Sequence, residues 1–393
     1  MKLRIHDTLA SLDAGAWNAL AGTDYPFLRH EFLSTLERTQ SIGGESGWNL
    51  QLITLEDTNG LAAAAPGWIK THSYGEFVFD FAWAQAYHQH GLSYYPKLIL
   101  AAPFTPATGP RLLCRNDLAR EATLDKLIDA IEQTALDQGC SSVHALFPTA
   151  QDQTVFAKRG WLARKDCQFH WSNRGWRDFE DYLGSFTSEK RKKARRERRR
   201  VAEAGIRFET VWGHEASELQ ALSAWQLHRI TFLRRGNEPY LNAQSFLELC
   251  RSMGDSLMFK LALLGDEIVA CAVFFVGRDT LYGRYWGAAE DFHSLHFETC
   301  YHQGIEFCIE RGLARFEPGT QGEHKVSRGF EPTDTASAHR IFDERFARAI
   351  DDYLRRERVA VDRYAANVRE HIPFRLAPDT AADSSPDTAP AAS

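Results

Sequence analysis

One pattern of predicted elements occurs twice along the chain and limits the folds it can adopt. Residues 50–83 contain three apolar-rich runs, "LQLITLE", "LAAAAPGWIKT" and "FVFDFAW", which are separated by "DTNG" and "HSYGE". Residues 257–287 repeat this layout with "LMFKLALL", "IVACAVFFV" and "LYGRYWG", separated by "GDE" and "GRDT". Apolar runs between turns that carry Gly, Asp or Asn predict antiparallel strands. The sequence therefore predicts two three-stranded meanders.

An amphipathic helix follows each meander, and a short apolar strand follows each helix. The helices are predicted to stop at Gly139 and Gly312, and "SSVHALF" and "LARFEPG" supply the strands. The residues predicted to face inward are Leu124, Leu127, Ile128 and Ile131 in the first helix and Cys300, Tyr301, Ile305 and Cys308 in the second.

This doubled order predicts an α/β (α+β) protein with two tandem domains on mixed, mostly antiparallel sheets. We place the domains at residues 1–172 and 173–376. Residues 377–393 contain Pro, Ala, Ser and Asp but no large apolar side chain, and we expect a disordered tail there.

The composition favours a cytoplasmic protein without a metal. Seven scattered cysteines without a CxxC pair suit free thiols in a reducing compartment, and no His or Cys spacing fits a metal site. We find neither the apolar core of a signal peptide nor an uncharged apolar run of about twenty residues. A pI near 6.2 argues against general coating of nucleic acid, so any anion binding must be local.

The segment "SEKRKKARRERRR" (188–200) holds nine Lys or Arg in thirteen positions, although the chain has a net charge of −6. It predicts a helix that starts at Ser188 and stops at Gly205. Like charges four residues apart destabilise an isolated helix by a few tenths of a kcal/mol per pair. We therefore interpret the segment as a binding face for tRNA, a nucleotide-diphosphate lipid or acidic membrane headgroups; a solvated helix face is the alternative. The residues chosen for this role are Lys192, Arg195, Arg196 and Arg199.

The predicted strand order resembles the acyltransferase fold of the GNAT superfamily, and two such domains resemble the Fem-type aminoacyltransferases of peptidoglycan synthesis. The runs "YYPKLILAAPFTPATGPRLL" (94–113) and "FEPGTQGEHKVSRGFEPTDTASAH" (316–339) sharpen the likeness to a bacterial FemAB-like family of peptidoglycan biosynthesis or recognition proteins. The basic segment is similar to the helix that opens the second Fem-type domain. The resemblance covers nearly the whole chain except the tail. It implies transfer of an acyl or aminoacyl group to a small-molecule or peptide amine, with aminoacyl-tRNA or acyl-CoA as donor and no tightly bound cofactor.

One departure bears on the donor. GNAT enzymes that use acetyl-CoA usually hold its pyrophosphate with a Q/R-x-x-G-x-G/A loop at a helix N-terminus. The corresponding stretches, "PFTPATGPRLLCRNDLAR" and "GAAEDFHSLHFETC", lack that loop, and Glu290 and Asp291 would repel a pyrophosphate. The sequence therefore disfavours acetyl-CoA. In this it is similar to Fem-type enzymes, which take their acyl group from charged tRNA.

The run from residue 317 to 330 leaves a predicted strand through two glycines, which let a backbone approach a ligand closely. Aminoacyl transfer needs a base for the attacking amine and a positive charge or N–H donors for the oxyanion. We expect His324 to be the base and Lys325 or Arg328 to hold the oxyanion or a donor phosphate. A surface loop whose charges pair with one another is the alternative. The predicted catalytic residues are Glu317, Glu323, His324 and Lys325.

The proline-rich run from residue 94 to 113 predicts a rigid loop, because prolines fix its shape at low entropic cost. Its hydroxyl and cationic side chains suit a polar, anionic acceptor. A rigid structural crossover is the alternative. The predicted substrate-binding residues in this run are Tyr95, Lys97, Thr105, Thr108 and Arg111.

Residues 232–242, "FLRRGNEPYLN", predict the end of a helix followed by a turn. Arg234, Arg235 and Tyr240 could form a second phosphate contact. Ordinary capping by arginines that the helix dipole favours explains them equally well.

Three functions fit these patterns. The first is a transferase with one site shared between the domains and no covalent enzyme intermediate, since no Ser-His-Asp or Cys-His arrangement stands out. The second is a pair of degenerate domains that binds a polyanion without catalysis. The third is an acetyl-CoA-dependent N-acetyltransferase.

Overall fold

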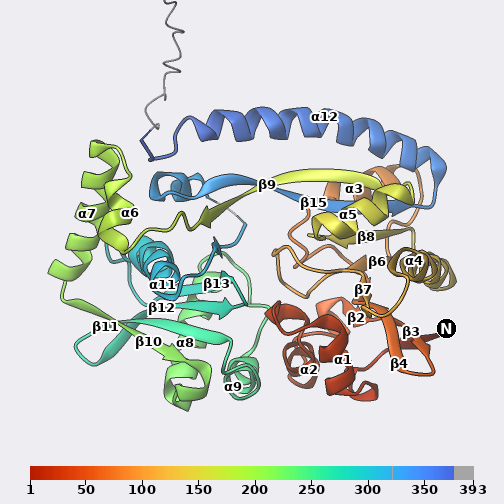
Figure 1. The fold of residues 1–393 in the computed structure, drawn as a ribbon, viewed down its shortest axis with the longest axis horizontal. Coiled ribbons are helices and arrows are strands. Elements are labelled where there is room, and N and C mark those ends of the chain that lie inside the picture. Colours follow the sequence, from red (N-terminus) through yellow and green to blue (C-terminus); the bar gives the residue numbers. More distant parts are fainter. Residues whose placement is uncertain (321, 376–393) are drawn as a thin grey trace, which may run out of the picture.

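The computed structural model describes residues 1–320 and 322–375 (Figure 1). The predicted tail at 377–393 lies outside these residues. The strands and helices of residues 1–172, termed the first half, are β1 (Lys2–His6), α1 (Ala14–Ala21), α2 (His30–Arg38), β2 (Trp48–Leu50), β3 (Leu52–Asp57), β4 (Gly60–Ala65), β5 (Gly67–Lys70), α3 (Phe81–Gln89), β6 (Lys97–Leu100), β7 (Leu113–Cys114), α4 (Arg120–Asp137), β8 (Ser142–Leu146), α5 (Ala150–Lys158) and β9 (Leu162–Ser172).

Residues 173–375, termed the second half, begin with two helices that precede the sheet strands. A π-helical turn (Glu298–His302) joins two of the later helices, and a 3₁₀ segment (Glu323–Arg328) follows β14. The elements are α6 (Phe179–Gly184), α7 (Ser188–Glu203), β10 (Ile206–Trp212), α8 (Glu218–Leu233), α9 (Ala243–Ser252), β11 (Leu257–Leu264), β12 (Glu267–Val276), β13 (Thr280–Ala288), α10 (Leu295–Phe297), α11 (Gln303–Arg311), β14 (Arg315–Glu317), β15 (Glu331–Ile341) and α12 (Glu344–Arg369).

Two sheets organise the fold. Eleven strands form one sheet in the order β10-β11-β12-β13-β14-β9-β15-β8-β6-β5-β2, and four strands form the other in the order β1-β3-β4-β7. β15 belongs to the second half by sequence but lies between β9 and β8, where Ala338 is opposite Ala163 and Ala145. The division at residue 172 stays a prediction, and strand pairing connects the two halves across it.

The predicted repeat is confirmed in the second half, but the first meander needs correction, because each of its first two runs is divided between the two sheets, as β2 and β3 and as β4 and β5. β11, β12 and β13 form the second meander, and α11 and β14 follow as expected. In the first half, however, "FVFDFAW" is not a strand, because α3 begins at Phe81. Asp80 binds the buried Lys97, and this contact fixes the chain just before the helix. β6 takes the place of the third strand, ahead of α4 and β8.

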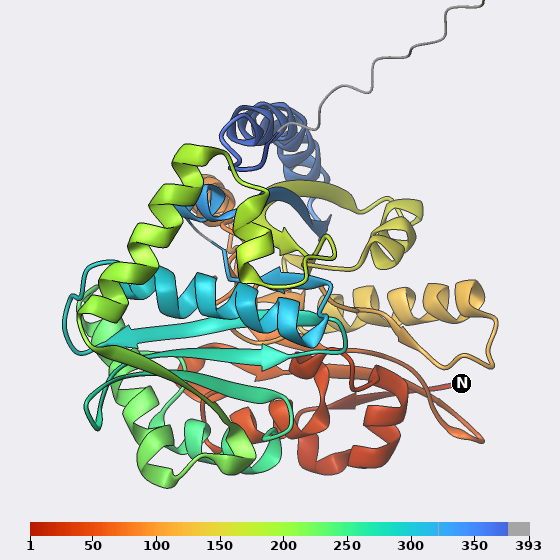
Figure 2. The same cartoon turned by 60° about the vertical axis from the view of Figure 1, so that its left-hand side comes forward.

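The N-terminal segment packs against the strands of the second half rather than only against its own. The ring of Phe27 lies 5.2 Å from Phe275 and 5.1 Å from Tyr282, measured between centroids. Phe32 and Trp17 belong to the same buried cluster. Figure 2 shows this segment (red) beneath the strands of the second half (teal). Apolar burial therefore joins the two halves into one core.

The long helix α12 lies across β9 and β15 and spans both halves of the large sheet (Figure 1). Arg164 on β9 pairs with Glu357 at 2.7 Å, and Lys165 pairs with Asp362 at 2.5 Å. In the described part of the chain, no helix has both the length and the apolar character needed to cross a membrane.

Candidate active site

The parallel strands β13 and β14 run side by side for a short distance and then separate. They pair from Thr280 to Tyr282, after which β14 ends at Glu317 while β13 continues to Ala288. A cavity of about 80 Å³ lies where they part. Its wall includes Arg284, Tyr285, His296, Cys300, Tyr301 and Pro318.

Arg284 forms a bulge on β13, because the register shifts between the residues of β12 that face Gly283 and Tyr285. A bulge bends a strand and redirects a side chain. Nη2 of Arg284 donates to the carbonyl of Phe104, whereas Nε is buried without a hydrogen-bond partner in the described residues. Burial lowers the pKa of this guanidinium. Arg284 therefore has a buried N–H available to a ligand.

Glu317 ends β14 next to this cavity, and its side chain is buried. Burial raises its pKa to about 7, although the nearby charge of Arg315 and a hydrogen bond from the backbone N–H of Thr108 oppose the rise. Oε2 has no hydrogen-bond partner within residues 1–320 and 322–375. A carboxylate with a pKa near 7 can accept a proton at neutral pH.

His324 and Lys325 approach the same cavity from the 3₁₀ segment. Nε2 of His324 lies 2.9 Å from the hydroxyl of Tyr301, and desolvation lowers the pKa of the imidazole. Nζ of Lys325 donates to the carbonyl of Gly319 at 2.7 Å. Burial lowers the pKa of Lys325 to about 7, and the thiol of Cys300 partly offsets this effect. Lys325 can therefore exchange a proton near neutral pH, whereas the surroundings of His324 favour its neutral imidazole.

The proline-rich segment of the first half lies beside this site, where Phe104 contacts Arg284 and Thr108 contacts Glu317. The Tyr25 hydroxyl donates to Ala107 O at 2.9 Å, and Nε2 of Gln168 donates to Pro106 O at 3.1 Å. The ring of Phe104 stacks on Tyr240 with centroids 4.7 Å apart. Because Phe104 and Thr108 also contact Arg284 and Glu317, the two sequence runs that carried the family resemblance meet here.

The profile of the FemAB-like family, described as peptidoglycan biosynthesis/recognition, matches residues 8–376. The chain belongs to the FemAB-like family. A search of curated protein sequences found no match.

Solved structures share the fold of this FemAB-like chain at low sequence identity. The C-terminal domain of a protein assigned as a lysylphosphatidylglycerol synthetase from Agrobacterium fabrum is 11% identical, with a TM-score of 0.54; the match covers 88% of this chain and 97% of that one. FemX is 10% identical, with a TM-score of 0.54 and coverage of 89% and 100%. L-PGS from Bacillus licheniformis is 12% identical, with a TM-score of 0.50 and coverage of 81% and 92%.

Several predicted site residues serve other contacts. Arg111 is fully buried and donates to the carbonyls of Leu146, Pro110 and Ala107, which fixes the proline-rich segment. Thr105 donates to Pro103 O within that segment.

Two predicted residues of the second sequence run point away from the cavity. Glu323 accepts a hydrogen bond from Tyr364 of α12 at 2.9 Å and lines a different cavity, of about 380 Å³. Arg328 is buried against Glu197 of the basic helix α7. The structure thus brings Glu317 close to Thr108 and Arg284, and it places His324 against Tyr301 in the wall of the cavity. Glu323 and Arg328 lie apart from both groups.

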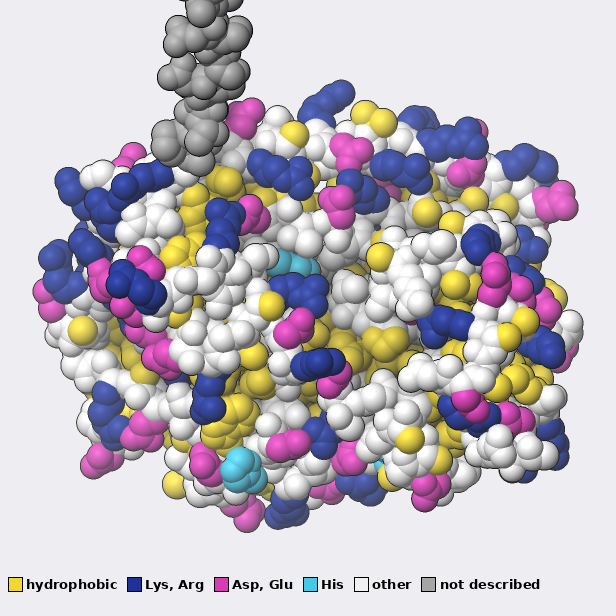
Figure 3. Space-filling model, in the orientation of Figure 1, with side chains coloured by type: hydrophobic (Ala, Val, Ile, Leu, Met, Phe, Trp, Pro, Cys, Tyr) yellow, Lys and Arg dark blue, Asp and Glu magenta, His cyan; other side chains and the backbone are white. Residues whose placement is uncertain are grey.

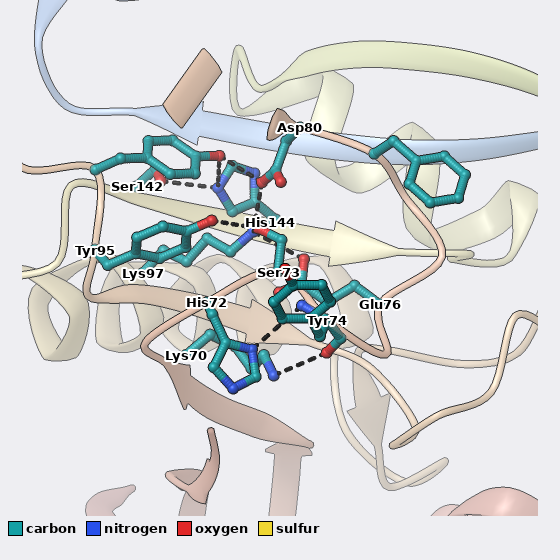
Figure 4. A network of polar contacts seen from close by, with 12 residues as sticks. Lys70, His72, Ser73, Tyr74, Glu76, Asp80, Tyr95, Lys97, Ser142 and His144 are labelled. Atoms are coloured by element: carbon teal, nitrogen blue, oxygen red, sulfur yellow. Dashed lines mark hydrogen bonds and ion pairs between the residues drawn. The ribbon is translucent and has the colours of Figure 1, made fainter. Parts of the chain in front are cut away.

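Tyr95 and Lys97 belong to a separate polar network with Ser73, Glu76 and Asp80 (Figure 4). Nζ of Lys97 contacts Glu76 at 2.8 Å, Ser73 at 2.8 Å and the carboxylate of Asp80. The Tyr95 hydroxyl lies 2.8 Å from Ser73 Oγ. Burial favours a neutral Lys97, but the two carboxylates raise its pKa above the ordinary value. Lys97 thus holds residues 73–80 onto the sheet.

The basic helix α7 is confirmed as a helix, although Thr187 rather than Ser188 occupies its N-cap. Figure 3 shows Lys and Arg side chains gathered at the upper left edge, where α7 lies in Figure 1. The four residues predicted to bind anions, termed the outer cations, are all exposed: Lys192, Arg195, Arg196 and Arg199. Arg195 pairs with Glu180 and Arg199 with Glu203, whereas Lys192 and Arg196 have no ion pair in the described chain.

Arg234 and Arg235 lie at the exposed end of α8. Arg234 caps the chain after β13 by donating to Ala289 O at 3.0 Å, and it pairs with Asp291. Tyr240 stacks on Phe104, whose carbonyl accepts a hydrogen bond from Arg284.

The sequence patterns did not identify Arg284, Tyr301 or Tyr25 as site residues, although Tyr301 was predicted to face inward from its helix. An arginine between aromatic residues on a predicted strand, "LYGRYWG", was a usable signal for Arg284. No local pattern indicates Tyr25, because its contact with Ala107 joins residues far apart in the sequence. Within the described residues, no group of three or more His, Cys, Asp or Glu could hold a metal ion.

Proposed function

We propose that this FemAB-like protein is an acyl- or aminoacyltransferase that forms an amide on an amine acceptor at the cavity between β13 and β14. The observation that carries the proposal is that Glu317 and Arg284 lie near each other where these strands part. Each presents a buried polar atom without a partner in the described residues. Unpaired buried polar groups cost free energy, which a bound substrate can offset.

The proposed step requires no covalent bond to the enzyme. The acceptor nitrogen attacks the carbonyl carbon of the donor ester, and Glu317 accepts the proton that the nitrogen loses. Arg284 stabilises the oxyanion that forms. The C–N bond is then retained while the C–O bond to the donor breaks, and protonated Lys325 gives the leaving oxygen its proton. The contact of His324 with Tyr301 holds the 3₁₀ segment (Glu323–Arg328) beside the bound acceptor.

We propose aminoacyl-tRNA as the donor, with the outer cations of α7 as contacts for its phosphates. Support comes from their exposure and from the acidic turn after β13, where Glu290 and Asp291 are exposed and disfavour the pyrophosphate of CoA. A thioester donor would undergo the same step with C–S cleavage. The acceptor amine would belong to a peptidoglycan precursor, as the family description suggests.

Transfer from bulk aminoacylated tRNA to lysine-containing stem peptides tests the reaction. We expect product with the wild-type protein and a loss of at least a hundredfold in kcat/KM for Glu317→Gln and Arg284→Met. Glu323→Gln is the matched control, because its carboxylate lies in another cavity, and it should retain activity. Equal activity in Glu317→Gln and wild type would overturn the site, and product formed only from acyl-CoA would overturn the donor.

A second candidate is a polyanion-binding protein without turnover, which the outer cations favour. Filter binding of bulk tRNA across a salt series separates the two. Changing Lys192 and Arg196 to Gln should flatten the salt slope by about 0.7 to 0.9 per lost phosphate contact. Tight, salt-dependent binding with no product from either donor would favour this second function.

A further inference from the structure

The helix α7 carries one acidic residue on its buried face, and that residue contacts the 3₁₀ segment that carries His324 and Lys325. Glu197 is 6% exposed, although it lies within the run of nine Lys and Arg. Its carboxylate accepts two bonds from Arg328, from Nη2 at 2.6 Å and from Nε at 3.1 Å. Nε2 of His302 lies 3.2 Å away on the other side. A carboxylate so placed has no part in binding an anion on the outer face.

Arg328 in turn holds the 3₁₀ segment. Its Nη1 donates to the carbonyl of His324 at 2.5 Å and to Ser327 Oγ at 3.2 Å. Its guanidinium lies 3.5 Å from the centre of the Phe297 ring. Because the bond to His324 is made by the backbone, any movement of Arg328 moves the imidazole and the neighbouring Lys325 as well.

The backbone at Arg328 is fixed independently by α6. The Tyr182 hydroxyl donates to Arg328 O at 2.6 Å. The next residue, Gly329, has a φ of +84°, and a Cβ there would lie 2.1 Å from that hydroxyl. Glycine at this position lets α6 approach the loop. The two helices that open the second half therefore hold Arg328 from two directions.

Charge explains why this contact is specific. Burial alone would raise the pKa of Glu197, but the hydrogen bond from His302 and the charge of Arg328 hold it below its ordinary value. Burial lowers the pKa of Arg328, and Glu197 opposes that effect. Each charged group is thus retained by the other, and loss of one leaves the other buried and unpaired.

We infer that Glu197 and Arg328 are positioning residues that make α7 and the loop at residues 323–328 one mechanical unit. The helix whose outer face is proposed to bind the donor would thereby hold His324 and Lys325 at the cavity. The catalytic meaning of this coupling rests on the proposed function, whereas the coupling itself does not.

Hydrogen–deuterium exchange of peptides from residues 322–330 tests the coupling. The amide of Lys325 donates to Gly322 O and that of Gly329 to Val326 O, both at 3.0 Å, so both report on the loop. We expect Glu197→Gln to speed their exchange at least tenfold. Glu306→Gln is the matched control, because it breaks the Arg198–Glu306 pair, at 2.7 Å, between α7 and α11. It should leave the loop unchanged.

Arg328→Lys provides a second variant that keeps the charge, in case Glu197→Gln does not fold, and it should also speed exchange because a lysine cannot bind Glu197 in a bidentate manner. Unchanged loop exchange in a folded variant, or an equal rise in Glu306→Gln, would overturn the inference whatever the reaction. tRNA binding and its salt slope should stay at wild-type values in Glu197→Gln, while kcat for transfer falls at least tenfold with KM for tRNA unchanged. Faster exchange with full turnover would retain the coupling but remove the catalytic role of His324 and Lys325.

Discussion

Two parallel strand pairs occupy matching places in the halves of this protein, but their ends differ. Beyond β6 and β8, the first half closes on itself, since Gly109 pairs with Pro148 and Arg111 donates to Leu146 O. Beyond the paired part of β13 and β14, the strands separate around a cavity. The segment that closes the first pair is the proline-rich run of residues 94–113, termed the closing segment, and it also contacts Arg284 and Glu317 beside the second pair. One copy of the repeat thus serves as scaffold for the site in the other.

The buried lysines of the two halves show the same contrast. Lys97 lies between Glu76 and Asp80, and their charges raise its pKa despite burial. Lys325 has a backbone carbonyl as its hydrogen-bond partner, and burial lowers its pKa to about 7. A buried lysine with ion-pair partners holds the fold together, whereas a buried lysine without one can change its protonation near neutral pH.

The largest difference should come from replacing these lysines. Lys97→Met leaves two buried carboxylates without a cation and should lower the free energy of unfolding by about 3–5 kcal/mol. Lys325→Met removes a side chain that is already half neutral at pH 7 and should change that free energy by less than about 1 kcal/mol. Urea unfolding at pH 7 measures both. Equal losses would show that Lys325 is as structural as Lys97.

The two arginines give the next largest difference. Arg111→Met removes bonds to three carbonyls and should cost about 3 kcal/mol of unfolding free energy. Arg284→Met removes one bond to Phe104 O and a buried N–H that has no partner in the described residues, and it should cost less than about 1 kcal/mol. Thermal and urea unfolding compare them. A greater loss of unfolding free energy in Arg284→Met would mean that the separated ends of β13 and β14 are held as tightly as the closed ends of β6 and β8.

Glu317 should make the free energy of unfolding depend on pH. Its pKa is about 7 in the folded chain and near 4.5 when unfolded, so the folded state binds more protons between these values. Stability should therefore fall by about 2 kcal/mol between pH 5 and pH 7 on account of this group. In Glu317→Gln that part of the fall should vanish, which urea unfolding at several pH values measures. Glu76 has a pKa raised to about 7 as well and leaves a similar fall in the variant. An unchanged profile would contradict the raised pKa of Glu317.

Local patterns predicted the repeat, both main helices and the basic helix because each depends on periodicity and on stop residues such as Gly139 and Gly312. The prediction of a third strand in the first half, "FVFDFAW", was wrong. The contact of Asp80 with Lys97 that fixes the chain there joins residues that no periodicity connects. Likewise, the grouping of Glu317 with Thr108 depends on tertiary packing. Sequence could supply the reactive residue types. The sequence did not indicate which of these residues form buried ion pairs in the fold, as Arg328 does with Glu197.

The smallest predicted effect concerns the contact that joins the closing segment to the second half. Phe104 and Tyr240 stack with their planes 10° apart. An aromatic pair adds about 0.5–1.5 kcal/mol beyond the area it buries. In a double-mutant cycle of Phe104→Leu and Tyr240→Leu, measured by urea unfolding, we therefore expect a coupling energy of about 1 kcal/mol.

Tyr364→Leu paired with Phe104→Leu is the control cycle, because Tyr364 contacts Glu323 rather than the closing segment. It should be additive within about 0.3 kcal/mol. Additivity in the Phe104–Tyr240 cycle as well would mean that the closing segment is held by the first half alone, through Arg111 and Tyr25. The wall of the site would then be independent of the half that carries Glu317. A measured coupling would instead show that the Phe104–Tyr240 contact ties the closing segment to the second half, beside the strands β13 and β14 that part around the cavity. Loss of either aromatic ring should then also weaken substrate binding at the cavity.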